Sequence, residues 1–171
     1  TSLEFRKKVA SLAFGETAYY ESLIYNYFND NSSNEFPKKI ILGFNRIEKL
    51  RYGENPHQEG AIYSSRDLGL EKLNGKQLSY NNYADIFSAL QISKSFPNNK
   101  GTVIVKHGNP CGASIHKNNN ESFLMAHKCD PISSFGGIVS CNFKINRSLA
   151  LKLNKLFFEV IIGNDFEKDA C

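Results

Sequence analysis

The sequence predicts a layered α/β domain whose strands run parallel. From residue 82 onward, patterns typical of helices alternate with short apolar runs typical of strands, in the order α, β, α, β, α, β. Residues 103–105 are three consecutive β-branched residues, which suits a strand buried on both faces of a sheet. Gly108, Asn109-Pro110 and Gly112 then end this strand in a loop. In open α/β sheets, ligands bind at the edge where such strands end and their loops begin.

Composition limits the function classes. At 171 residues and 41% hydrophobic content, the chain is about the size of one domain with a real core. Its net charge of +4 comes from scattered basic residues, whereas nucleic-acid binding usually needs a clustered basic face. No apolar run approaches the length of about 20 residues that a membrane helix needs, and no secretory segment is visible. The four cysteines, 111, 129, 141 and 171, have no CxxC spacing, so we expect reduced thiols in the cytosol.

The first third of the chain is expected to hold two helices and a hairpin. Thr1 and Glu4 form a capping-box pattern for a first helix that ends at Gly15. The remaining predicted elements are a second helix at 18–28, a polar linker at 29–34, a hairpin of 40–44 with 47–50 around Asn45-Arg46, and a short strand at 61–63.

The rest of the chain carries the alternating pattern. Asn82 is placed to cap a helix that runs to about Phe96. The later predicted elements are a helix at 121–129, a strand beginning at Ile138, a helix capped by Asn146, a strand at 159–163 and an unfinished helix at 165–171.

Three loops concentrate polar side chains and glycines: 51–58, 106–112 and 130–137. Arg51 offers a planar fork suited to phosphate, and Tyr52 an aromatic face. Lys106 and His107 follow the buried strand directly. Taken alone, such a Lys-His pair is more often part of a solvated loop than a catalytic pair.

The amino-acid sequences of these loops resemble those of a known family. RYGENPHQ, KHGNPCG, DPISSFGGIV and EVIIGNDF are similar, in this order, to signatures of the bifunctional purine biosynthesis proteins, which couple AICAR transformylase to IMP cyclohydrolase. The similarity covers essentially the whole chain. It implies formyl transfer from 10-formyltetrahydrofolate, as co-substrate, to AICAR, followed by ring closure to IMP. It also implies a cytosolic homodimer with transformylase sites at its interface, and a fold similar to cytidine deaminases without a metal.

The resemblance also assigns residues and domains. The catalytic Lys-His pair of the family corresponds to Lys106 and His107. The nucleotide contacts correspond to Arg51, Tyr52, Gly136 and, near the last strand, Glu159. Residues 1–44 resemble the C-terminal helices of the cyclohydrolase domain with a linker, and 45–171 resemble the N-terminal part of the transformylase domain. We therefore expect a fragment of a longer enzyme, with neither full activity on its own.

The residues suit this chemistry. The aromatic amine of AICAR is a poor nucleophile, so its attack gains from a base, and His107 is the natural candidate near neutral pH. Lys106 can stabilise the developing negative charge or protonate the leaving folate nitrogen. The sequence leaves the roles of acid and base between the two residues open.

Two other functions compete with this interpretation. Pro110-Cys111 matches half of the PCxxC motif of zinc deaminases, but position 114 is Ser114 and no His-x-Glu precedes it, so two zinc ligands are missing. Alternatively, Arg51 and the glycine loops serve a non-catalytic nucleotide-binding module.

Overall fold

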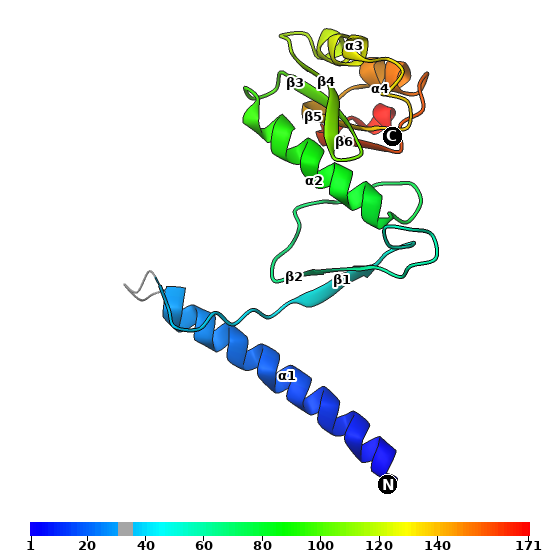
Figure 1. The fold of residues 1–171 in the computed structure, drawn as a ribbon. Coiled ribbons are helices and arrows are strands. Elements are labelled where there is room, and N and C mark those ends of the chain that lie inside the picture. The colour runs from blue at the N-terminus through cyan, green and yellow to red at the C-terminus, as the bar shows by residue number, and fades with distance from the viewer. Residues whose placement is uncertain (31–35) are drawn as a thin grey trace. The chain divides into compact units, whose positions relative to one another are not determined.

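The computed structural model describes residues 1–30 and 36–171 and divides into two compact units (Figure 1). Unit 1 consists of Thr1–Lys49 and Ala61–Glu71. Unit 2 consists of Leu50–Gly60 and Lys72–Cys171. Most of the predicted linker at 29–34 lies outside the described residues, and its first two residues belong to a helix.

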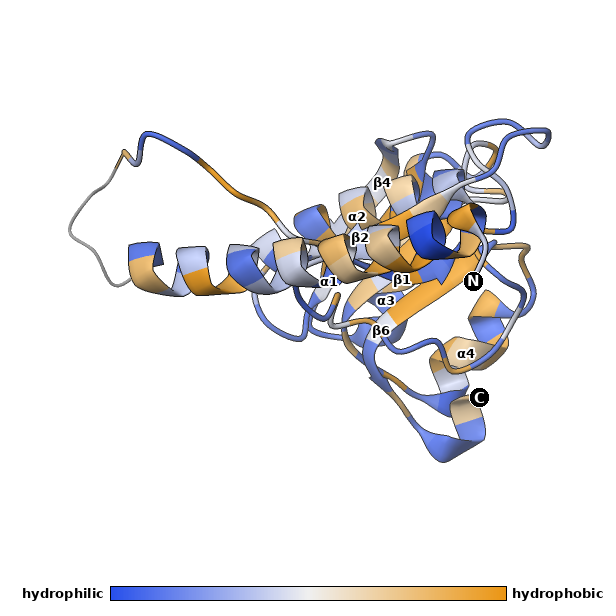
Figure 2. Cartoon of the chain, turned by 90° about the horizontal axis from the view of Figure 1, so that it is seen from below, coloured by the Kyte–Doolittle hydropathy of each residue, from blue (hydrophilic) through white to orange (hydrophobic). Residues whose placement is uncertain are grey.

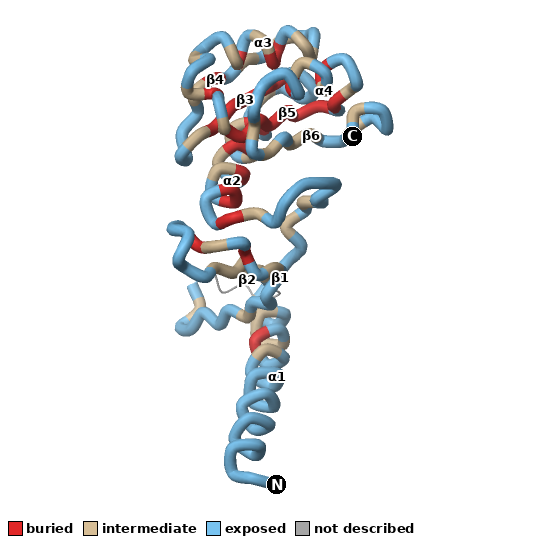
Figure 3. The backbone as a smooth tube through the Cα atoms, turned by 90° about the vertical axis from the view of Figure 1, so that its right-hand side faces the viewer, coloured by how far each residue is buried: buried red, intermediate tan, exposed pale blue. Residues whose placement is uncertain are grey.

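Unit 1 begins with one long helix, α1 (Leu3–Asp30), so the prediction of two helices separated at Gly15 is wrong. A glycine inside a helix costs only about 1 kcal/mol relative to alanine, which the flanking turns outweigh. The predicted cap at Thr1 is also wrong by one residue, because Ser2 Oγ accepts a hydrogen bond from Phe5 N at 3.2 Å. Hydrophobic and hydrophilic residues alternate along α1 (Figure 2), and most of the helix is exposed (Figure 3).

The other regular part of unit 1 is a pair of antiparallel strands, β1 (Asn45–Lys49) and β2 (Ala61–Ser64). The short strand predicted at 61–63 is confirmed, but the hairpin around Asn45-Arg46 is wrong. These two residues lie within β1 and pair with Ser64 and Tyr63. The polar dipeptide therefore continues a strand instead of turning the chain.

Unit 2 confirms the α/β class, but the prediction of parallel strands is wrong for most of the sheet. Its described residues form a sheet in the order β4-β3-β5-β6. Only β5 and β6 pair in parallel, and β3 is antiparallel to both of its neighbours. The bounds are β3 (Gly101–Lys106), β4 (Asn109–Ile115), β5 (Ile138–Ile145) and β6 (Val160–Phe166).

The difference arises at a tight turn. Lys106 pairs with Asn109, so only His107 and Gly108 connect β3 to β4, and both have positive φ, of 54° and 76°. Two such residues are typical of a type I′ hairpin. Residues 109–112, expected to be a loop, are therefore the start of a strand, and Pro110 is tolerated because β4 lies at the sheet edge. Strands β4 and β5 then run in the same direction on either side of β3.

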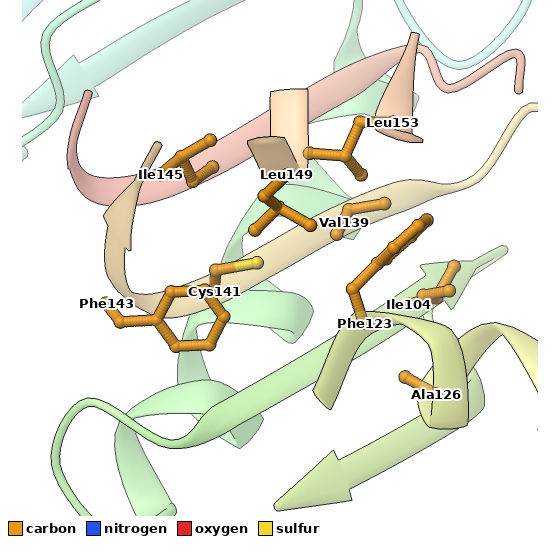
Figure 4. Packing of buried hydrophobic residues seen from close by; sticks show 9 residues of the cluster. All are labelled: Ile104, Phe123, Ala126, Val139, Cys141, Phe143, Ile145, Leu149 and Leu153. Carbon is orange, nitrogen blue, oxygen red and sulfur yellow. The ribbon is translucent and has the colours of Figure 1, made fainter. Parts of the chain in front are cut away.

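Three helices cover this sheet as predicted: α2 (Tyr80–Ser95), α3 (Asn119–Cys129) and α4 (Arg147–Leu153). On one face, Ile104, Val139 and Cys141 pack with residues of α3 and α4 (Figure 4). On the other, Ser140 of β5 bonds Ser93 of α2 at 2.8 Å. Because successive strand residues point to opposite faces, unit 2 has three layers.

Of the two helix caps predicted in unit 2, one is confirmed, and the helix predicted at the end of the chain is not. Asn146 caps α4 by accepting from Leu149 N at 2.9 Å, as predicted, but α2 is capped by Ser79 rather than Asn82. The helix predicted at 165–171 is wrong: β6 continues to Phe166, and a single 3₁₀ turn, η1 (Lys168–Ala170), follows.

All four cysteines are free. Burial raises the pKa of the Cys141 thiol to about 12. In the part of the chain that the structure describes, no helix has both the length and the apolar character needed to cross a membrane.

Candidate active site

The sheet topology brings three of the candidate residues together at one edge. Because β3 is antiparallel to β5, the end of β3 lies beside the start of β5, and β6 starts next to it. Lys106 Nζ donates to the carbonyl oxygen of Phe135 at 2.7 Å. In the same loop, Gly136 N donates to Phe157 O at 2.8 Å, and Glu159 N donates to Gly137 O at 3.0 Å. Lys106, Gly136 and Glu159 therefore share this edge.

The loop before β5 is a compact, hydrogen-bonded turn. Asp130 Oδ1 accepts from Ser133 N at 2.9 Å, and its carbonyl oxygen accepts from Ser134 Oγ at 2.6 Å. Hydrogen bonds from Ser133 lower the pKa of the Asp130 carboxyl, with a further contribution from the charge of Lys106. Gly136 has φ of 72°, a conformation that side chains disfavour, so its backbone is presented without a Cβ in the way.

His107 occupies the first position of the β3–β4 turn and is exposed. Its backbone N–H donates to Asp85 Oδ2 at 3.2 Å, and the N–H of Gly108 donates to Asp85 Oδ1 at 2.6 Å. Ser88 Oγ donates to the Gly108 carbonyl oxygen at 2.9 Å. Asp85 and Ser88 both belong to α2, so this helix holds the turn that carries His107.

Arg51 and Tyr52 lie in a loop that is attached to the start of α2. Arg51 N donates to Leu78 O at 3.0 Å, and Tyr80 N donates to Tyr52 O at 3.2 Å. The exposed Arg51 guanidinium lies over the Tyr52 ring, 4.8 Å from its centroid, and donates to the phenol oxygen at 3.2 Å. Stacking on the ring orients the guanidinium while leaving donors of its fork for an anion.

Asn82 links this loop to the sheet edge. It sits at the third position of α2, where its Oδ1 accepts from Ser79 N at 3.0 Å and completes a capping box. Its Nδ2 donates to Glu159 Oε2. The expected cap is therefore a bridge, and Glu159 already has a protein partner. Among the contacts of residues 1–30 and 36–171, no hydrogen bond or ion pair joins the Arg51 side chain to Lys106 or His107.

The Cys111 thiol lies close to the same edge but does not resemble a metal ligand site. Its Sγ is 4.0 Å from Ser134 Oγ, and burial raises its pKa. Within the described residues, no group of three or more His, Cys, Asp and Glu side chains is arranged to hold a metal ion.

The comparison with known proteins places the chain in a family. The model of the AICARFT/IMPCHase bienzyme matches residues 1–171. The chain belongs to this family. The resemblance that the four sequence motifs indicated is thereby confirmed.

Two of the curated relatives show the extent of the similarity. A protein of Aquifex aeolicus (strain VF5) is 42% identical and covers 99% of this chain, and one of Thermoanaerobacter sp. (strain X514) is 41% identical over the same share. Both are named bifunctional purine biosynthesis protein PurH. The chain spans about a third of their length, 35% and 34% respectively.

Sequence reasoning missed Asp85 and Ser88 and misread Asn82. The two α2 residues are three apart and so lie on one helical face, which a sequence pattern can show. Their partner, however, is a turn 20 or more residues away that was expected to be an open loop. No local sequence signal indicates that these two residues of α2 contact the β3–β4 turn.

Proposed function

We propose that this chain works as part of a longer two-activity enzyme of purine synthesis. Residues 45–171 belong to the part that transfers a formyl group from 10-formyltetrahydrofolate to the 5-amino group of AICAR. Residues 1–44 belong to the part that closes the ring to give IMP. Membership of the bienzyme family and the names of the relatives support this proposal. The structural observation that supports it most is that Lys106, Gly136 and Glu159 lie at the same edge of the sheet.

The proposed reaction is an acyl transfer between nitrogens. The amine nitrogen of AICAR attacks the formyl carbon, and His107 removes the amine proton. The tetrahedral intermediate carries negative charge on its oxygen, which the Lys106 ammonium stabilises. The bond from carbon to the folate nitrogen then breaks, and that nitrogen takes up a proton from the enzyme, so that formylated AICAR and tetrahydrofolate leave. The Lys106 ammonium lies at the sheet edge, where it donates to the carbonyl oxygen of Phe135 at 2.7 Å.

The remaining candidates hold the nucleotide. Arg51 takes the phosphate with its fork, and Tyr52 packs against the ligand. The backbone at Gly136 approaches the ligand closely, and Glu159 accepts a hydrogen bond from it. We further propose that the enzyme is a cytosolic homodimer, without a metal ion, whose formyl-transfer sites lie at the interface.

An assay of the full-length enzyme tests the function. Supplied with AICAR and 10-formyltetrahydrofolate, it is expected to release tetrahydrofolate and form IMP, while the 171-residue chain alone forms neither product. Light scattering is expected to give twice the monomer mass. A full-length protein that binds AICAR but never releases tetrahydrofolate is instead a nucleotide-binding module.

Replacing Arg51 by lysine tests the phosphate contact. Lysine keeps the charge but loses the planar fork, so the Kd for AICAR is expected to rise about tenfold, the equivalent of one charge-assisted hydrogen bond. Isothermal titration of the full-length enzyme measures this. The matched control is Arg66→Lys at an exposed position of unit 1, which should leave the Kd unchanged. Equal affinity in both variants would assign Arg51 a structural role.

A further inference from the structure

The mechanism above does not use Asp85, although this half-buried side chain touches the candidate catalytic turn directly. Its two carboxylate oxygens accept from two consecutive backbone amides, those of His107 and Gly108. Ser88, one helical turn later, donates to the carbonyl oxygen of Gly108. Two side chains of α2 therefore satisfy both backbone donors of this two-residue turn and one of its two carbonyl acceptors. The other acceptor, the carbonyl oxygen of His107, takes a hydrogen bond from Asn109 Nδ2 at 3.0 Å.

This turn needs support because of the residue at its first position. His107 has φ of 54°, in the left-handed region, where residues other than glycine are strained and asparagine or glycine would be usual. Such a conformation persists where the surroundings hold it in place. Hydrogen bonds from amides to a carboxylate are among the stronger ones available. The observed contacts are therefore of the kind that keeps a strained turn in one conformation.

We propose that Asp85 is a positioning residue for His107, with Ser88 assisting it. This inference rests on the proposed function, in which the His107 imidazole moves the proton of the amine. The backbone angles at residue 107 fix the direction of the Cα–Cβ bond and hence where the ring lies. Asp85 holds those angles from the helix behind the turn and acts on the reaction only through His107. When these hydrogen bonds to Asp85 are lost, the imidazole ring moves away from its catalytic position. A shift of about 1 Å can lower the rate by up to 100-fold.

The first test is Asp85→Asn in the full-length enzyme. Asparagine has the same shape but one acceptor instead of two and no charge. The kcat of formyl transfer is expected to fall roughly 10- to 100-fold. The KM for AICAR is expected to change by less than about threefold, since the loss is felt in the transition state. Ser88→Ala should give a smaller fall in the same direction. Asp169→Asn, at an exposed position of η1, is the matched control and should keep the wild-type kcat.

Structural damage is separated by two further readouts. The cyclohydrolase rate and the melting temperature of Asp85→Asn should match those of the wild type. Combining it with His107→Ala should give a kcat no lower than that of His107→Ala alone, because a positioning residue has nothing left to position. Two outcomes would overturn the positioning role and leave the proposed function standing. One is a kcat in the double variant reduced by the product of the two single losses. The other is a wild-type kcat in Asp85→Asn while His107→Ala is slow. Normal formyl transfer by His107→Ala would overturn both.

Discussion

Replacing His107 by alanine in the full-length enzyme is expected to lower the kcat of formyl transfer by roughly 100-fold or more, the usual loss for a missing general base. The KM for AICAR should change much less, because proton removal is a transition-state event. Steady-state kinetics of tetrahydrofolate release measure both. Lys106→Ala should also slow turnover, and it should raise the KM as well if the ammonium contacts the bound nucleotide.

The turn itself supplies a control for this experiment. His107 lies in the left-handed region, and alanine is strained there as well, so the loss in the alanine variant could come from the backbone. Asparagine tolerates this conformation best among residues with a side chain. His107→Asn should therefore keep the turn, lose the imidazole and be as slow as His107→Ala. Ring closure, which we propose for the other part of the enzyme, should proceed normally in both. Near-normal formyl transfer in the asparagine variant would return Lys106 and His107 to an ordinary solvated loop.

Local chemistry explains which elements the sequence could predict. The buried strand at 103–105, the helix capped by Asn146 and the loop at 130–137 each follow from residues that are adjacent in the chain. The prediction failed where the outcome depended on partners. Asn45-Arg46 continues a strand because β2 lies beside it. Gly15 is a different case, since the flanking helical turns of α1 outweigh the cost of the glycine.

The sheet direction and the site show the same limit. A histidine is an unusual first residue for a two-residue hairpin turn, so nothing local indicated that β4 folds back on β3. Once this hairpin is missed, the directions of β3 and β5 are predicted wrongly too. The sequence motif singles out Lys106 and His107 as candidate residues, but Asp85 acquires its contact only through the packing of α2 on that hairpin. The catalytic roles of the pair remain a prediction until the variants are measured.

Asn142 is a position in unit 2 where a substitution that keeps the side-chain shape is expected to cost much stability. It lies on β5 and is 8% exposed. Its Oδ1 accepts from Lys100 N at 3.0 Å and from Gly101 N at 2.8 Å. Its Nδ2 faces three carbonyl oxygens, those of Ser93, Phe96 and Pro97, at 3.2, 3.3 and 3.0 Å. One amide therefore joins the end of α2 to the start of β3.

Asn142→Asp changes this group without changing its shape. The carboxylate still accepts from the two backbone amides, but it cannot donate, so the carbonyl oxygens lose their partner and face a negative charge in a site with little water. Burying such an unpaired group costs about 3 kcal/mol or more, which corresponds to a fall of roughly 6–12 °C in the melting temperature of a domain of this size. Calorimetry of the full-length enzyme measures the transition. Asn98→Asp makes the same chemical change in the neighbouring exposed loop and should shift the melting temperature by less than about 2 °C, as surface substitutions do. Equal melting temperatures for the two variants would show that the Asn142 amide donors add nothing to the stability of the link between α2 and β3.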